Sequence, residues 1–343
     1  MINLTPMGER ARAAARKLML SSEDVKNSAL ECICNGLKSD CADILAANAL
    51  DLKNAKENGV GEAMCDRLML DEKRIYAIAD AVLSVAGLPD PVGKTLEVIK
   101  RPNGLEIEKK TVPMGVIGII FESRPNVTVD AAVLCLKAGS AVILRGGKEA
   151  INSNTALCNS MRASLEKAGL PSDCVQLISD TTRESATALM QLSGYLDLLI
   201  PRGGAGLIRS VVENSKVPVI ETGTGNCHVY IDETADVEMA VSITDNAKTQ
   251  RPSVCNACET LLVHKNIARE VLPKIKARLD KSNVQIRGCA VTKEILGESV
   301  VSATDEDYAV EFLDYIIAVK VVESLGDAIE HIVNYSSGHS ECI

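Results

Sequence analysis

The chain has 343 residues, a formal net charge of −9 and 46% hydrophobic residues. The acidic balance argues against a nucleic-acid-binding surface, and no apolar run approaches the ~20 residues that span a membrane. The N-terminus lacks the apolar core of a secretory signal, and the 12 cysteines are scattered, as in proteins that keep their thiols reduced. We therefore expect a cytoplasmic globular protein with two domains.

Residues 1–90 predict a helical region, because apolar residues recur there at helical spacing. A segment rich in Pro and Gly at 88–93 ends it. The sequence RPNGL at 101–105 predicts a turn, and beyond it apolar residues alternate with glutamates. We place an exposed hairpin at 99–112. Because open strand edges pair readily, we expect this hairpin to contact another subunit.

From Met114 onward, strand-like apolar runs alternate with helix-like runs. Trp is absent and Phe occurs twice, so the core must be aliphatic, which suits buried parallel strands covered by helices. The alternation predicts a doubly wound α/β fold, with a second α/β unit beginning near Gly223. The expected strands are 116–121, 141–144, 175–178, 196–200 and 217–220, then 227–232, 260–263, 284–287 and 313–322, with helices between them that include 205–214, 237–249 and 325–335.

Glycines follow two of the predicted strands, at the carboxyl ends where parallel sheets bind ligands. They could let the backbone approach a phosphate at a helix N-terminus, or they could only serve tight turns, and both interpretations stay open. The GxGxxG fingerprint of dinucleotide-binding folds is missing. Arg145 and Lys148 could reach a ribose 2′-phosphate, which favours NADP over NAD. The glycines concerned are Gly146, Gly147, Gly203 and Gly204.

Cys255 lies in the stretch TDNAKTQRPSVCNACETLLVH at 244–264, with Lys248 and Arg251 before it. A thiolate attacks carbonyls and acyl phosphates well, and nearby positive charge lowers a thiol's pKa, so Cys255 is a candidate nucleophile. The alternative is a buried structural cysteine. Cys255 and Cys258 also form a CxxC pair, for which a redox or zinc site is a further alternative. The four histidines have no metal-ligand spacing, and we expect no metal site.

Four long motifs together resemble a known family. They occur in the order MGVIGIIFESRPNVTVDAAVLCLKAGSAVILRGG, IPRGGAGLI, VIETGTGN and NAKTQRPSVCNACETLLVH. In these the chain is similar to the glutamate-5-semialdehyde dehydrogenases, also called gamma-glutamyl phosphate reductases, of the aldehyde dehydrogenase superfamily. The resemblance runs from the N-terminus to Ile343.

The resemblance implies an aldehyde-dehydrogenase-like fold with two doubly wound α/β domains and a protruding hairpin. It assigns 1–98 and 113–222 to a cofactor-binding domain, 99–112 to an oligomerisation hairpin and 223–343 to a catalytic domain. Members of the family continue past the position of Ile343, so we expect the catalytic domain to be truncated at its C-terminus. We also expect a homo-oligomer, and a functional association with glutamate 5-kinase.

The resemblance also implies a mechanism. Cys255 would attack the acyl carbonyl of L-glutamyl 5-phosphate and expel phosphate, and the thioester would take a hydride from NADPH. The product, L-glutamate 5-semialdehyde, makes this the second step of proline biosynthesis from glutamate. Asn126 and the Cys255 backbone N–H would stabilise the oxyanion, although Asn126 also suits a helix N-cap.

Other site residues follow from the same resemblance. Glu221 matches the general base of hydrolytic family members, and it could take the Cys255 proton or only order the site. Glu311 resembles the glutamate that holds the nicotinamide ribose. Positive charge for the substrate phosphate would come from Lys248, Arg251, Arg124 and Arg202.

Two other functions stay open on the sequence. One is a hydrolytic aldehyde dehydrogenase that reduces NAD without phosphate, with Glu221 activating water. The other is a truncated chain without catalysis that binds a nucleotide or partner subunits. We expect the reductase.

Overall fold

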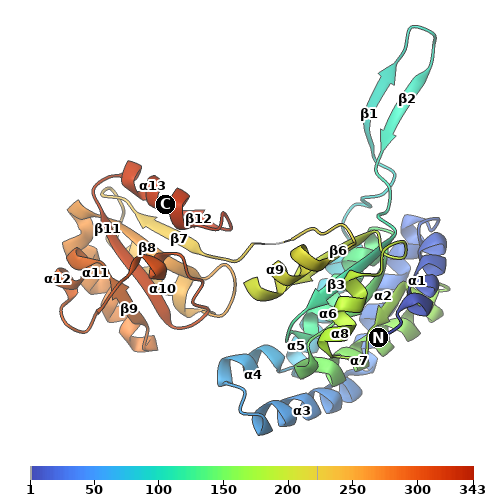
Figure 1. The fold of residues 1–343 in the computed structure, drawn as a ribbon, viewed down its shortest axis with the longest axis horizontal. Coiled ribbons are helices and arrows are strands. Elements are labelled where there is room, and N and C mark those ends of the chain that lie inside the picture. Colours follow the sequence, from blue (N-terminus) through green and yellow to red (C-terminus); the bar gives the residue numbers. More distant parts are fainter. Residues whose placement is uncertain (1, 222) are drawn as a thin grey trace. The chain divides into compact units, whose positions relative to one another are not determined.

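The computed structural model describes residues 2–221 and 223–343. The chain forms two compact units, Met1–Thr222 and Gly223–Ile343, which we call unit 1 and unit 2. Each unit contains a parallel sheet with helices packed against it, as the alternation of strand-like and helix-like runs predicts (Figure 1). No helix among the described residues is long and apolar enough to cross a membrane.

The sheet of unit 1 has four parallel strands in the order β5-β4-β3-β6. Every residue of β3 is buried, because helices cover both faces of the sheet. The strand predicted at 217–220 is wrong: only an isolated bridge joins Val219 to Leu199. Pro218 explains this, since it has no N–H to donate to a ladder. The strands are β3 (Val116–Phe121), β4 (Ala141–Arg145), β5 (Val175–Leu177) and β6 (Leu198–Arg202).

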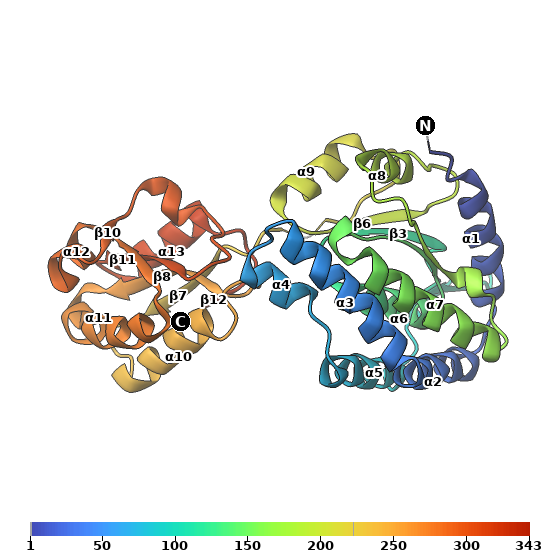
Figure 2. The same ribbon diagram turned by 90° about the horizontal axis from the view of Figure 1, so that it is seen from below.

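Nine helices surround this sheet in the described part of unit 1, on both of its faces (Figure 2). One face is buried under α2, α5, α6 and α7, and the other under α1, α8 and α9. The bounds are α1 (Thr5–Leu18), α2 (Glu23–Ser39), α3 (Cys41–Glu57), α4 (Glu62–Leu68), α5 (Glu72–Ala86), α6 (Pro125–Lys137), α7 (Ile151–Lys167), α8 (Arg183–Met190) and α9 (Ala205–Asn214), with short 3-10 turns at Lys148–Ala150 and Ser172–Cys174.

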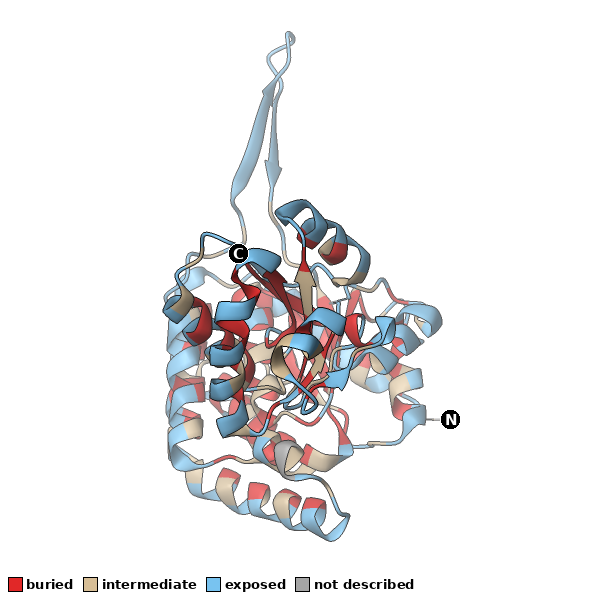
Figure 3. Ribbon diagram, turned by 90° about the vertical axis from the view of Figure 1, so that its left-hand side faces the viewer, coloured by how far each residue is buried: buried red, intermediate tan, exposed pale blue. Residues whose placement is uncertain are grey.

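A two-stranded antiparallel hairpin projects from the rest of unit 1 (Figure 1). Its strands are β1 (Thr95–Lys100) and β2 (Glu106–Lys110), and every residue of both is exposed (Figure 3). Gly104 closes the turn with φ 84°, a backbone angle that glycine adopts without strain. The first strand begins at Thr95, earlier than the start of the hairpin predicted at residue 99.

Unit 2 is built on a six-stranded sheet in the order β10-β9-β11-β8-β7-β12, with every pair parallel. α10 and α11 pack on one face and α13 on the other. The strands are β7 (Cys227–Ile231), β8 (Cys258–His264), β9 (Gln285–Gly288), β10 (Val301–Ser302), β11 (Ile316–Val322) and β12 (Glu341–Cys342). The helices are α10 (Val237–Thr249), α11 (Lys265–Leu279), α12 (Ala290–Leu296) and α13 (Leu325–Tyr335), with 3-10 turns at Asp280–Ser282 and Asp305–Tyr308.

The last long strand of unit 2 begins later than predicted. The expected strand at 313–322 starts at Ile316 in the structure. Leu313 has φ 53°, in the left-handed region that an extended strand does not use. Its backbone N–H donates to the Glu259 carboxylate and not to a neighbouring strand.

Candidate active site

Cys255 lies in the loop between α10 and β8, and it is exposed, so a substrate can reach its thiol. Its CxxC partner Cys258 is the first residue of β8 and is buried. The Cys258 thiol donates to the Thr260 carbonyl at 3.4 Å, and burial raises the pKa of Cys258 to about 12. All 12 cysteines are free thiols. Because Cys255 is exposed and Cys258 is buried with a raised pKa, Cys255 is favoured as the nucleophile and Cys258 as a packing neighbour.

The backbone of Cys255 is held against β7 and the residues that precede it. Gly225 comes so close that an added Cβ would lie 1.5 Å from the Cys255 carbonyl oxygen. No side chain fits there, so glycine at this position lets the two backbones touch. The Cys227 thiol also donates to the Cys255 carbonyl, at 3.1 Å. These contacts hold the Cys255 backbone within residues 250–257, which we call the nucleophile loop.

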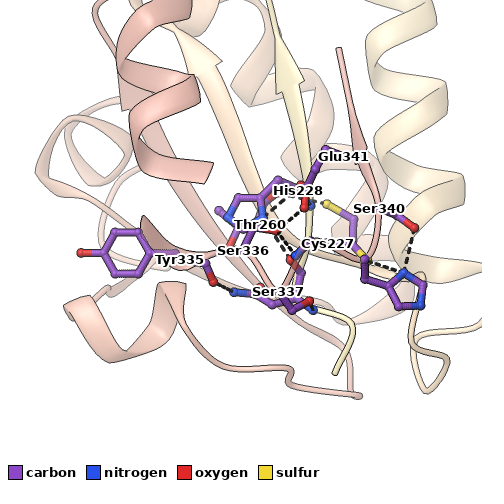
Figure 4. Close-up of polar contacts among 12 residues, drawn as sticks. Cys227, His228, Thr260, Tyr335, Ser336, Ser337, Ser340 and Glu341 are labelled. Atoms are coloured by element: carbon purple, nitrogen blue, oxygen red, sulfur yellow. Dashed lines mark hydrogen bonds and ion pairs between the residues drawn. The ribbon is translucent and has the colours of Figure 1, made fainter. Parts of the chain in front are cut away.

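The same short segment anchors two more loops of unit 2. The Asn226 side chain donates to the carbonyls of Tyr308 and Tyr335, both at 2.7 Å, and its backbone N–H donates to the Ser337 hydroxyl at 3.0 Å. Figure 4 labels Tyr335 and Ser337 together with Cys227 and His228. Sequence reasoning missed this role, although the sequence GTGN directly before a strand was the available signal.

The chain after α13 lies beside the nucleophile loop. His339 Nδ1 is 3.7 Å from the Cys227 sulfur, and the backbone N–H of His228 donates to Glu341 at 3.0 Å (Figure 4). His339 is exposed, and its Nδ1 is 2.8 Å from the Ser340 hydroxyl. Sequence reasoning does not place His339 near Cys255, because 84 positions separate them in the chain.

Glu311 reaches the same place from the segment before β11. Its carboxylate accepts the Gly225 backbone N–H at 3.0 Å, next to the contact between Gly225 and Cys255. Glu311 is half-buried. A carboxylate at this position could receive ribose hydroxyls, so the predicted role of Glu311 toward the nicotinamide ribose remains a proposal.

Lys248 was predicted as a ligand for the substrate phosphate, and the structure corrects this. Its ammonium is fully buried and donates to the Glu259 carboxylate at 2.6 Å, with both side chains closed from solvent. A cation that neutralises an internal carboxylate is not placed to receive an external phosphate. Arg251, by contrast, is exposed and lies in the nucleophile loop itself, so it stays a candidate.

Asn126 lies in the first turn of α6, which begins at Pro125 with Arg124 as the N-cap residue. The alternative of Asn126 as an N-cap is therefore wrong. Its side-chain amide donates to Asp130 at 2.8 Å, one helical turn further on. Glu221 and Arg202 are exposed in unit 1. Because Asn126 and Glu221 belong to unit 1 and Cys255 to unit 2, their joint action stays a prediction.

The glycines at the strand ends of unit 1 divide into packed and open positions. A Cβ on Gly146 would lie 2.2 Å from the Asn154 amide, and one on Gly147 would lie 2.7 Å from Glu149. Gly203 is closed in the same way by Glu122. Neighbouring side chains thus lie close to these three glycines, whereas an added Cβ on Gly204 would meet its nearest atom only at 3.9 Å.

Gly204 is the N-cap residue of α9, and its backbone N–H donates to the Glu122 carboxylate at 3.0 Å. The helix N-terminus thus already donates to an anionic oxygen, as expected from its N–H groups and its dipole. Gly206, in the first turn, has open space around its Cα. The predicted role of Gly204 toward a dinucleotide phosphate therefore stays a proposal.

Arg145 was predicted to reach a ribose 2′-phosphate, and the structure gives it another role. Its guanidinium donates to the carbonyls of Thr181 and Thr182, at 2.6 Å and 2.9 Å, which fixes the loop before α8. Burial lowers the pKa of Arg145 from its usual range. Lys148 is exposed after the same strand, so it is the better candidate for a phosphate.

Comparisons with known proteins agree on one family. The aldehyde dehydrogenase family model matches residues 12–292. A gamma-glutamyl phosphate reductase of Carboxydothermus hydrogenoformans is 56% identical over 98% of this chain and 81% of its own length. One from Caldicellulosiruptor saccharolyticus is 54% identical over 100% of this chain and 83% of its own length.

Solved structures lead to the same family. The crystal structure of a gamma-glutamyl phosphate reductase from Thermotoga maritima matches with TM-score 0.92 and 46% identity, over 100% of this chain and 83% of that one. An acetylating aldehyde dehydrogenase from Geobacillus thermoglucosidasius shares the fold, with TM-score 0.71 and 19% identity over 98% of this chain and 80% of that one. The chain belongs to the aldehyde dehydrogenase family and, within it, to the gamma-glutamyl phosphate reductases.

Proposed function

We propose that this chain reduces L-glutamyl 5-phosphate to L-glutamate 5-semialdehyde and phosphate, the NADPH-dependent second step of proline biosynthesis from glutamate. The observation that carries the proposal is the exposed Cys255 thiol, whose backbone is held by Gly225 and Cys227. The chain that presents this thiol is 52–56% identical to gamma-glutamyl phosphate reductases. An acyl phosphate is a good partner for such a thiol, because phosphate is a good leaving group.

Cys255 would act as the nucleophile. Its thiolate attacks the acyl carbon, the carbon–oxygen bond to phosphate breaks, and a thioester forms. NADPH, when bound, supplies the hydride that reduces this thioester. The tetrahedral adduct then collapses to the aldehyde and returns the electron pair to the Cys255 sulfur. A thioester suits this sequence because it stays electrophilic while resisting water.

The oxyanion formed at each step needs donors. The side-chain amide of Asn126 and the backbone N–H of Cys255 would supply them, and one such donor is worth about 100- to 1000-fold in rate. Glu221 would take the Cys255 proton or order the site. Arg251, Arg124 and Arg202 would share the charge of the leaving phosphate.

The cofactor would bind mainly to unit 1. The first turn of α9, at Gly204, would hold the pyrophosphate through backbone N–H groups. Lys148 would pair with the ribose 2′-phosphate that distinguishes NADPH from NADH. Glu311 in unit 2 would hold the nicotinamide ribose. Their common effect would be to present the reactive carbon of the nicotinamide to the thioester on Cys255.

The proposal includes a homo-oligomer in the cytoplasm. Strand β1 of the hairpin leaves Leu96 62% exposed and Val98 50% exposed, and such apolar side chains on open strands favour pairing with a second copy. A functional association with glutamate 5-kinase is part of the same proposal, since acyl phosphates hydrolyse readily in water and benefit from direct use.

The reverse reaction tests the proposal. Phosphate-dependent reduction of NADP+ with pyrroline-5-carboxylate would be followed at 340 nm for the unaltered chain, Cys255→Ala and the matched control Cys258→Ala. We expect activity that requires phosphate, falls more than ~1000-fold in Cys255→Ala and stays within ~3-fold in Cys258→Ala. Reduction without phosphate would indicate a hydrolytic dehydrogenase. Activity retained by Cys255→Ala would refute the nucleophile.

A further inference from the structure

A buried ion pair lies behind the nucleophile loop. Lys248 is in the last turn of α10, and Glu259 is the second residue of β8, four positions after Cys255. Their charged atoms are 2.6 Å apart and both side chains are fully buried. Removing two charges from water is costly, and an apolar pair of similar volume is often equally stable or more so. Stability alone therefore does not explain the pair.

The second oxygen of Glu259 binds a different part of the chain. Oε2 accepts from Lys248, whereas Oε1 accepts the backbone N–H of Leu313 at 3.1 Å. Leu313 has φ 53°, and for a residue with a side chain this left-handed conformation is unfavourable. Such a conformation persists only where surrounding contacts impose it. The bond from Glu259 is a contact that does so.

The segment fixed in this way carries Glu311, two positions before Leu313. The Glu311 carboxylate accepts the Gly225 N–H at 3.0 Å, and Gly225 packs directly against the Cys255 carbonyl. A continuous path of contacts therefore joins the buried pair to the backbone of the nucleophile. The path uses one hydrogen bond at each end of the segment 311–313.

A second contact holds the same segment. The Arg287 guanidinium lies 5.1 Å from the centre of the Phe312 ring, and it also donates to Asp307 at 2.5 Å. These contacts keep the segment attached to unit 2 without involving Glu259. Neither contact involves the Leu313 N–H. The direction of this N–H, and with it the path to Gly225, therefore depends on its hydrogen bond to the Glu259 carboxylate.

We propose that Glu259 is a positioning residue for the reaction at Cys255. Through Leu313 it sets the conformation of residues 311–313, which places the Glu311 carboxylate and Gly225 against the nucleophile loop. Lys248 is the counter-ion that lets a carboxylate stand at this buried position. The effect of Glu259 on the reaction at Cys255 rests on the function proposed above. Its effect on the conformation of residues 311–313 does not.

Two double variants separate the hydrogen bond from the charges. Lys248→Met with Glu259→Gln removes both charges and keeps an oxygen that can accept from Leu313. Lys248→Met with Glu259→Met removes both charges and the acceptor. An exposed pair, Lys274 and Glu238, joins α10 to α11 at 3.1 Å away from this path, and replacing both with Met is the control.

Amide hydrogen exchange of the free protein is the first measurement. We expect the peptides that contain Gly225 and Leu313 to exchange at least ~10-fold faster in the Glu259→Met double variant than in the Glu259→Gln double variant, because one backbone bond is lost at the core of the path. The peptides of β9 and α11 should exchange alike in both. The exposed control should match the unaltered chain throughout.

Steady-state kinetics of the reverse reaction is the second measurement. The Glu259→Met double variant should have a kcat at least ~10-fold below that of the Glu259→Gln double variant, since misplacing a reacting group by about 1 Å can cost ~100-fold. The KM for phosphate should differ by less than ~3-fold between them. A merely structural role would lower the amount of active protein and change both variants alike.

Three results would overturn the proposal. Equal exchange at Gly225 and Leu313 in the two double variants would overturn the proposal, and so would equal kcat. Loss of the folded state in both would also overturn it, because the pair would then support the whole unit and not this segment. If the unaltered chain lacks phosphate-dependent activity but the exchange rates separate, the proposed function fails while the structural path stands.

Discussion

Replacing Gly225 with alanine should disable the nucleophile while leaving the rest of unit 2 folded. The new Cβ would lie 1.5 Å from the Cys255 carbonyl oxygen and 2.7 Å from its Cα. Contacts under 3.0 Å essentially do not occur for a real Cβ, so the nucleophile loop must withdraw by roughly 1.5 Å. A misplacement of about 1 Å can cost ~100-fold in rate, or ~2.7 kcal/mol of transition-state stabilisation.

The matched control is Gly223→Ala, where the nearest atom to the new Cβ is the Ser337 carbonyl oxygen at 3.8 Å, an ordinary contact. We expect kcat/KM of the reverse reaction to fall at least ~100-fold for Gly225→Ala and less than ~3-fold for Gly223→Ala. Overpacking should lower the free energy of unfolding by about 1–3 kcal/mol, measured by urea denaturation. A folded Gly225→Ala protein with unchanged kcat/KM would refute the close backbone contact.

Three further predictions concern other parts of the chain. Lys148→Ala should weaken the binding of NADPH ~10-fold and leave the binding of NADH unchanged, as measured by fluorescence titration. Arg145→Ala should leave the preference for NADPH over NADH unchanged and should lower the melting temperature. Asp51→Ala should lower the free energy of unfolding by about 3 kcal/mol in urea, because the buried Asp51 carboxylate accepts four hydrogen bonds from Asn152 and Ser153 at the start of α7. Burial, together with the charges of Lys320 and His228, lowers the pKa of His331 to about 3. Between this pKa and the ordinary histidine pKa near 6.5, the unfolded chain binds a proton at this side chain and the folded chain does not. Stability should then fall by up to ~1.4 kcal/mol per pH unit between pH 6.5 and 3, and less steeply in His331→Asn.

The regular elements could be predicted where one pattern dominates. The structure has α9 at 205–214, α10 at 237–249 and α13 at 325–335, the ranges expected from helical spacing, and β3 at 116–121 from a continuous apolar run. The prediction failed at 217–220, where apolar residues continue but Pro218 prevents a ladder. It also failed at Leu313, because apolar character does not show that a backbone N–H is bound to a buried carboxylate.

The candidate site was harder to predict, because proximity in sequence does not reveal what a charge faces. Lys248 and Arg145 both stand in motifs that suggest anion binding. The structure turns the first toward Glu259 and the second toward the carbonyls of Thr181 and Thr182. Exposed neighbours of the same motifs, Arg251 and Lys148, remain available for anions. A cation near a functional motif can therefore support the surrounding structure without binding a ligand, as Lys248 and Arg145 do here.

The nucleophile loop shows why the family motifs are long and separated. The Cys255 carbonyl is fixed by Gly225 and by Cys227, 28 residues before it. Gly225 is in turn fixed by Glu311, 86 residues later in the chain. A thiol needs a defined position more than it needs a particular neighbour, since proximity supplies much of the rate. Short loops from distant parts of the chain can provide that position only where glycine lets backbones touch and where carboxylates accept their N–H groups. The sequence GTGN at 223–226 and the motif NAKTQRPSVCNACETLLVH therefore act as one structure in unit 2, although they are separate in the sequence.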